Sequence, residues 1–93
     1  MTFKINELDG LKDTVVVIDT NTHYVYVGTL KAADEGFLVL ADADVHDISE
    51  GSSTKEMYAV EARRHGVQKN RREVLVRTSH VVSLSRLDDV ILY

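Results

Sequence analysis

The chain has 93 residues and a formal net charge of −4, which leaves room for one domain with a thin core and argues against a protein built mainly to coat duplex nucleic acid. It contains no cysteine, which excludes disulfides and thiolate metal sites. No stretch resembles a signal peptide or approaches the roughly 20 apolar residues of a membrane span. We therefore predict a cytoplasmic protein that makes no membrane contact and gains stability by oligomerisation.

The first residues predict a short helix followed by a strand. Residues 1–13 carry an apolar residue at every third position, which favours a helix that survives by docking: Ile5, Leu8 and Leu11. Residues 14–19 are apolar on both faces of an extended chain, which predicts a strand covered on both sides. Asn21 and Thr22 form the next turn.

Residues 24–40 predict a hairpin around which the rest of the chain is organised. Apolar residues alternate with a period of two, as in a half-buried strand. The chain reverses at residues 34–36, and the second strand runs over residues 37–45. Gly28 lies inside the first strand, where a glycine marks a bend or the close approach of another segment. We therefore expect a strongly curved sheet.

The segment 46–71 has a different character. Residues 53–56, Ser-Thr-Lys-Glu, match a capping box with Ser53 as the cap. The residues that follow favour a helix over 54–65 that ends at Gly66. The same residues also allow a long hairpin that extends the flanking strands, so both alternatives remain open.

Charge is distributed unevenly along the chain. Residues 34–50 include six acids and no Lys or Arg. Residues 63–72 include five basic residues and no acid: Arg63, Arg64, Lys69, Arg71 and Arg72. These runs are either two solvated faces, a nucleic-acid contact by the basic run, or segments that meet across a subunit boundary.

Two further strands are predicted at residues 74–77 and 81–84. Only Thr78, Ser79 and His80 separate them, which suits a sharp corner at the seam of a small barrel. The tail over residues 86–93 ends in the apolar run Val-Ile-Leu-Tyr, so we expect it to pack against the barrel or a neighbour.

The order of elements and two motifs resemble the Sm and LSm (Sm-like) family, which includes the bacterial Hfq proteins. The family's first motif is an aromatic, a glycine, an aliphatic residue and an aspartate at fixed intervals, and this chain has Tyr26, Gly28, Leu30 and Asp34. The second motif is an aliphatic strand ending in Arg-Gly and then another aliphatic strand. Residues 74–84 match it, except that Thr78 replaces the glycine.

The resemblance implies a mainly β fold, a small, strongly bent, five-stranded SH3-like barrel. It would carry a short N-terminal helix and an enlarged loop or helical insert between strands 3 and 4. The whole chain would be one Sm-like domain, made of helix, first motif, variable insert, second motif and tail: 1–13, 14–45, 46–71, 72–86 and 87–93.

Assembly follows from the same resemblance. In the Sm fold the last short strand pairs with the preceding strand of the next subunit. We therefore expect a homo-oligomeric ring, of five to seven subunits. The insert would project from one face of the ring and present its basic residues as a rim.

The family's uridine pocket is incomplete in this sequence. Uridine-binding members stack the base on an aromatic or His side chain two positions after the motif aspartate and bind it through an Asn four positions after. Here these positions are Gly36 and Leu38. Arg77 is retained, and it either contacts RNA by stacking or by gripping phosphate, or pairs with a neighbouring acid. The candidate RNA-binding residues are Asp34, Glu35, Arg77, Ser79 and the five basic residues of the insert.

Two functions are compatible with these features. The first is a ring that binds single-stranded RNA with weak or altered base preference, and the second is a structural ring that binds only itself or other proteins. We predict no enzyme, cofactor or metal. Asp44, His46 and Asp47 are too few for a coordination sphere, and Ser79 beside His80 has no acid partner.

Overall fold

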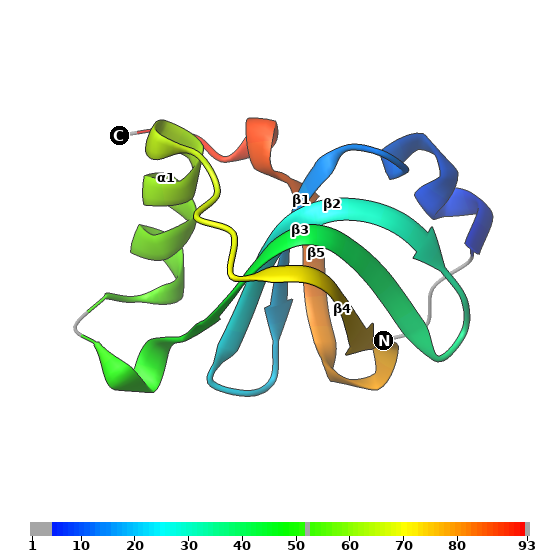
Figure 1. The fold of residues 1–93 in the computed structure, drawn as a ribbon, viewed down its shortest axis with the longest axis horizontal. Coiled ribbons are helices and arrows are strands. Elements are labelled where there is room, and N and C mark those ends of the chain that lie inside the picture. The colour runs from blue at the N-terminus through cyan, green and yellow to red at the C-terminus, as the bar shows by residue number, and fades with distance from the viewer. Residues whose placement is uncertain (1–4, 52, 93) are drawn as a thin grey trace.

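The alternating and apolar runs of the sequence form one antiparallel five-stranded sheet, whose strand order is β4-β3-β2-β1-β5 (Figure 1). The computed structural model describes residues 5–51 and 53–92. Its strands are β1 Val15–Thr20, β2 Tyr24–Ala33, β3 Phe37–Asp47, β4 Arg71–Arg77 and β5 Val81–Arg86. One α-helix, α1, spans Lys55–His65, and four short 3-10 helices are η1 Ile5–Leu11, η2 Ile48–Glu50, η3 Thr78–His80 and η4 Leu87–Asp89. The predicted mainly β fold is confirmed.

β1 lies between β2 and β5 and is buried on both faces. Val16 and Ile18 belong to one core cluster, together with Leu30, Leu38 and Leu40 of the hairpin. Val17 points to the other face and packs in a second cluster with residues of β2, α1 and η4. The prediction of a strand covered on both sides is therefore correct.

The N-terminal helix is present as the 3-10 helix η1. Leu8 is buried in the first core cluster and Leu11 packs against it. Residues 1–4 of the predicted helix lie outside the described residues. η1 is therefore held by docking, as the spacing of its apolar residues predicts.

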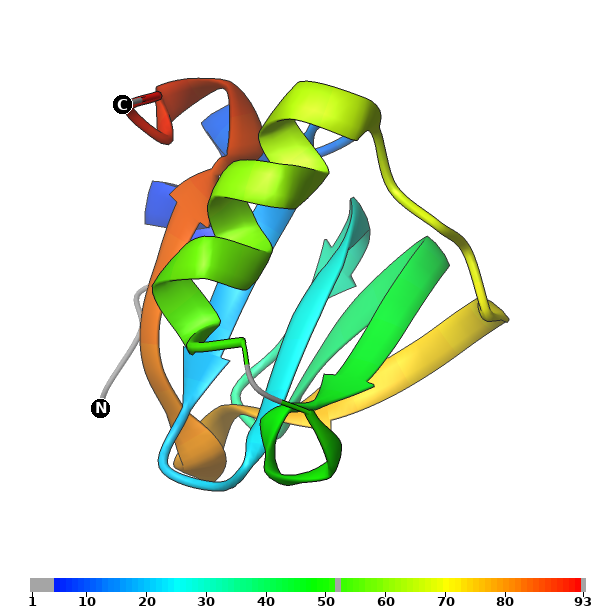
Figure 2. The ribbon, with the colours of Figure 1, turned by 90° about the vertical axis from the view of Figure 1, so that its left-hand side faces the viewer.

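α1 covers the second face of the sheet (Figure 2), so the helix alternative for the insert is confirmed and the hairpin is wrong. Its cap is Thr54, whose hydroxyl accepts a hydrogen bond from the backbone N–H of Met57 at 3.1 Å. The predicted cap, Ser53, is wrong by one position. Met57 therefore occupies the third helical position, and Glu56 stands one position too early for a capping box. Gly66 ends the helix at φ 86°, as predicted.

Polar contacts fix α1 to the sheet at two points. At its start, Lys55 Nζ lies 2.7 Å from both Asp19 Oδ1 and the carbonyl oxygen of Thr20. One turn further on, the hydroxyl of Tyr58 donates to Asp44 on β3, and burial together with this hydrogen bond raises the pKa of Tyr58. Asn70 donates to the other oxygen of Asp44 at 2.8 Å. The insert therefore lies against the sheet.

Among the described glycines, Gly28 has the least space for a side chain, because β2 and β3 approach each other closely there. A Cβ at this position would lie 2.8 Å from Cβ of Ala43 and 3.0 Å from its Cα. The pairing of β2 with β3 shifts register between Val27 and Thr29. Asp42, opposite this shift, has φ 50°, the left-handed conformation that bulges use. The predicted close approach at Gly28 is confirmed.

The C-terminal tail packs in part. Leu87 is buried and Val90 is half-buried against the second core cluster. Ile91 and Leu92 are 76% and 43% exposed, and Tyr93 lies outside the described residues.

No helix among the described residues is long and apolar enough to cross a membrane.

Substituting Gly28 tests the close approach of β2 and β3. We expect Gly28→Ala to lower the free energy of unfolding by about 1–3 kcal/mol, because the added methyl group overpacks against Ala43. Urea unfolding followed by circular dichroism measures this change. Gly51→Ala is the matched control, since nothing lies within 4 Å of its added Cβ. Equal unfolding midpoints for the two variants would contradict the packing argument.

Candidate nucleic-acid interface

The two motif loops lie side by side and are tied together by Thr78. Its backbone N–H donates to the carbonyl oxygen of Gly36 at 3.0 Å, and its hydroxyl donates to the carbonyl oxygen of Glu35 at 2.6 Å. Thr78 is buried, so neither bond is exposed to much competition from water. Thr78 stands where the motif that the sequence resembles has a glycine, and its hydroxyl makes a hydrogen bond that a glycine could not make.

Asp34 shapes the turn between β2 and β3. Its Oδ1 accepts hydrogen bonds from the backbone N–H groups of Gly36 and Phe37, both at 2.8 Å. The backbone N–H of Asp34 donates to the carbonyl oxygen of Phe37 at 2.9 Å. The carboxylate therefore serves the backbone of its own turn, and its first role in the structure is to position the loop.

Arg77 stands at the end of β4, opposite Phe37 of β3 in the strand pairing. Its guanidinium carbon lies 5.5 Å from the centre of the Phe37 ring, within the range of a cation–π contact. Among the described residues Arg77 forms no ion pair with Asp34 or Glu35. The structure therefore does not show the pairing of Arg77 with a neighbouring acid that the sequence allowed. Arg77 is exposed and available to a ligand.

The remaining positions of the expected pocket differ in exposure. Gly36, Ser79 and His80 are exposed, whereas Leu38 is fully buried in the first core cluster. A buried aliphatic side chain offers a base neither a stacking face nor a hydrogen bond. The exposed surface of the interface is therefore made by Glu35, Arg77, Ser79 and His80.

The basic residues of the insert lie elsewhere. Lys69, Arg71 and Arg72 line a hollow of about 320 Å³ together with Asp42 and Asn70. Arg71 begins β4 and Arg77 ends it, and at about 3.3 Å per residue this separates the two sites by roughly 20 Å. The structure therefore does not bring the insert and the motif loops together.

Arg63 and Arg64 form a second basic pair at the end of α1. Arg63 is half-buried, and its Nε has no hydrogen-bond partner in the described part of the chain, whereas Arg64 is exposed. Neither residue lines the hollow that Lys69, Arg71 and Arg72 form. The five predicted residues thus divide into two groups.

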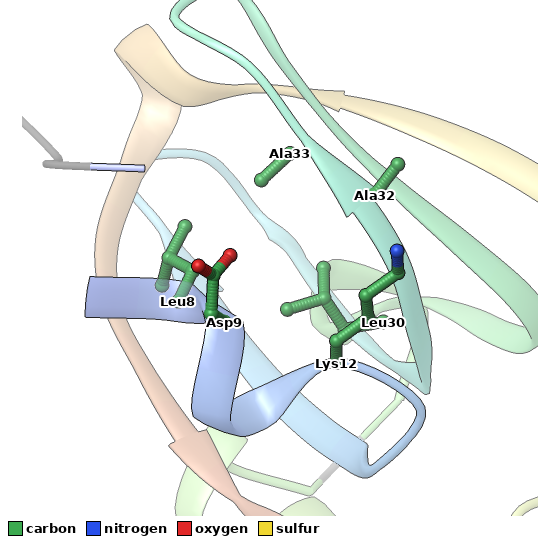
Figure 3. A pocket seen from close by; sticks show the side chains of 6 residues that line it. All are labelled: Leu8, Asp9, Lys12, Leu30, Ala32 and Ala33. Atoms are coloured by element: carbon green, nitrogen blue, oxygen red, sulfur yellow. The ribbon is translucent and has the colours of Figure 1, made fainter. Parts of the chain in front are cut away.

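A small hollow that the sequence did not predict lies between η1 and β2 (Figure 3). It has a volume of about 150 Å³ and is lined by Leu8, Asp9, Lys12, Leu30, Ala32 and Ala33. The predicted docking of the first helix was the only signal for it. Among the described residues, Asp9 and Lys12 are its only polar lining residues, so we assign it no chemistry.

The described residues contain no group of three or more His, Asp or Glu side chains arranged to hold a metal ion. No family model matches the sequence, and no curated protein matches it either. Similarity is found among solved structures.

One is the Sm protein of Pyrococcus abyssii in complex with a uridine heptamer, with a TM-score of 0.61 and 19% identity over 90% of this chain and 97% of that one. Another is a novel Sm-like archaeal protein from Pyrobaculum aerophilum, with a TM-score of 0.57 and 20% identity over 89% of this chain. This chain spans 50% of the Pyrobaculum protein. The chain therefore has the Sm-like fold that its two motifs predict.

Replacing Thr78 tests the tie between the motif loops. Thr78→Val keeps the shape of the side chain and removes the hydroxyl that bonds Glu35, so we expect a loss of about 0.5–1.5 kcal/mol in the free energy of unfolding. Amide hydrogen exchange at Phe37 and Thr78 should also become faster. Thr78→Ser, which keeps the hydroxyl, is the control. Equal exchange rates in the Val and Ser variants would refute the role of this hydrogen bond.

Proposed function

We propose that the chain is an Sm-like protein that forms a homo-oligomeric ring and binds single-stranded RNA through its motif loops. The observation that carries this proposal is the pair of loops fastened by Thr78, with Arg77 exposed beside them. The fold of an Sm protein in complex with a uridine heptamer supports it. We further infer membership of the Sm and LSm family, a cytoplasmic location and no catalytic activity.

The ring rests on the free edges of the sheet. β4 and β5 are the outermost strands, and each exposes an apolar side chain, since Leu75 and Val82 are both 53% exposed. Unpaired edges with apolar side chains are templates for pairing with another chain. Pairing of β5 with β4 of the next copy is heterologous and closes into a ring. We propose that the ring has five to seven subunits. We also propose that each subunit has a strongly bent sheet and an enlarged insert.

Weak base preference is part of the proposal. Gly36 and Leu38 occupy the positions that stack and read a base in uridine-binding relatives, and neither side chain can do so. Binding would then depend on Arg77, whose guanidinium stacks on any base or binds phosphate. Asp34, Glu35 and Ser79 shape the same surface.

A scaffold ring without RNA is the second candidate. The exposed apolar side chains of Leu75, Val82 and Ile91 favour it, because each can be buried against a protein partner. The two candidates differ in their response to salt. Binding driven by several phosphate contacts weakens by orders of magnitude between low and physiological salt, whereas apolar association does not.

Titration of oligo-uridine and oligo-adenosine at one fixed salt concentration tests the RNA site. We expect the two dissociation constants to differ less than about tenfold, or roughly 1.4 kcal/mol, because the stacking and base-reading residues are missing. Arg77→Ala should weaken both, and Arg77→Lys, which keeps the charge but not the planar group, should restore binding only in part. Strong selectivity for uridine would contradict the proposal, and no binding to either would favour the scaffold.

Light scattering tests the ring at micromolar concentrations. We expect the mass of a closed oligomer, and we expect Val82→Lys on the outer strand to reduce it, because an edge charge opposes strand pairing. Lys31→Ala, on an exposed position of the inner strand β2, is the control. A monomeric wild-type protein would overturn the ring.

A further inference from the structure

A hollow of about 280 Å³ lies between α1 and β3, away from the motif loops. This volume is near the lower end of the roughly 300–1,000 Å³ range of small-molecule pockets, which suits a single aromatic ring system. Its polar lining comes from β3, α1 and the segment after the helix: Asp44, His46, Tyr58, Glu61, His65 and Gln68.

One wall of the hollow is aromatic and rigid. The rings of His46 and Tyr58 are stacked, with centroids 4.3 Å apart and planes 7° apart. Tyr58 is held by its hydrogen bond to Asp44, and Asp44 is held in turn by Asn70. These hydrogen bonds hold Tyr58, and His46 stacks on it, so a flat ligand that stacks on the other face of His46 meets a ring that is already ordered.

Other polar groups around the hollow have capacity left for a ligand. Within the described residues neither ring nitrogen of His46 nor the side-chain amide of Gln68 has a hydrogen-bond partner. Oε2 of Glu61 lies 3.0 Å from Nε2 of His65, and the two side chains are 50% and 67% exposed. Exposed pairs of this kind are weak, so a ligand with two N–H donors can displace His65 from the carboxylate.

We propose that this hollow is a guanine-binding site. His and Tyr rings are stacking faces for nucleobases, and a carboxylate is a pure acceptor. Guanine presents two adjacent donors, N1–H and the N2 amino group, which match the two oxygens of Glu61. Uracil presents a single N–H between two carbonyl oxygens, which the carboxylate repels. Gln68 can donate to O6 of guanine.

Cationic side chains follow this hollow along the chain. Gln68 is followed directly by Lys69, which lines the neighbouring basic hollow with Arg71 and Arg72. We expect a guanosine nucleotide that is bound through its base to place its phosphate near these cations. Free nucleotide and a guanosine within RNA share this chemistry, and the site does not depend on the proposed function of the motif loops.

The four histidines of the chain serve both as NMR probes of the hollow and as internal controls. His46 and His65 line the hollow, His80 belongs to the motif loops, and His23 does neither. We expect guanosine monophosphate at about 1 mM to shift the imidazole C–H NMR signals of His46 and His65 and leave those of His23 and His80 in place. Adenosine and uridine monophosphates should bind about tenfold more weakly.

A second experiment distinguishes a site for free guanosine nucleotide from a site for guanosine within RNA. The RNA UUGUU should shift His46 and His65 more than UUUUU does if the site accepts guanine within a strand. If only the free nucleotide shifts them, the site is a nucleotide site. Either result supports the hollow. Signals that move only at His80 would support the motif-loop interface and overturn this proposal.

The decisive variant is Glu61→Gln, an exposed change that leaves the helix intact. It should weaken guanosine monophosphate binding about tenfold, because the amide presents only one acceptor, and it should bring the affinities for guanosine and uridine monophosphate together. Glu73→Gln, on an exposed position of β4 outside the hollow, is the control. Unchanged affinity in Glu61→Gln, or equal affinity of the wild type for all three nucleotides, would overturn the proposal.

Discussion

The arrangement of this protein depends on β1 being buried on both faces. Val16 and Ile18 require cover on one side, which η1 and the hairpin supply, and Val17 requires cover on the other. A chain of this length has little apolar surface to spare, so the insert after β3 must return to the sheet as α1. The position of α1, and with it the hollow against β3, follows from the burial of a single strand.

The motif loops are held in place by hydrogen bonds to their backbone. Asp34 orders its own turn through two backbone N–H groups, and Thr78 fastens that turn to the corner before β5. These hydrogen bonds all end on backbone groups, and none of them positions a side chain for contact with a base. The loops therefore take their geometry from Asp34 and Thr78, and the expected pocket positions Gly36 and Leu38 offer no base contact.

The sequence predicted those features that depend on residues close to one another in the chain. The alternation in β2 and the reversal at residues 34–36 came from residues close in sequence, and so did the helix before Gly66, although a hairpin remained an alternative there. The cap was misplaced from Thr54 to Ser53 because both are good caps and only the packing of the helix chooses between them. The bonds of Asp44 to Tyr58 and Asn70 span 14 and 26 positions. The sequence carried no signal for them or for the hollow they support.

The basic residues of the insert were predicted to lie together, but Arg63 and Arg64 lie in the last turn of α1, whereas Lys69, Arg71 and Arg72 line a hollow at the start of β4. Arg71 and Arg77 mark the two ends of this strand, so the strand itself holds the basic hollow and the motif loops apart. Its outer edge is free for pairing within the proposed ring. Pairing along that edge would align the strands of successive subunits and set the motif loops at one end and the basic hollows at the other. Ligands at the two sites would then bind without competing, and each would respond to salt according to its own phosphate contacts.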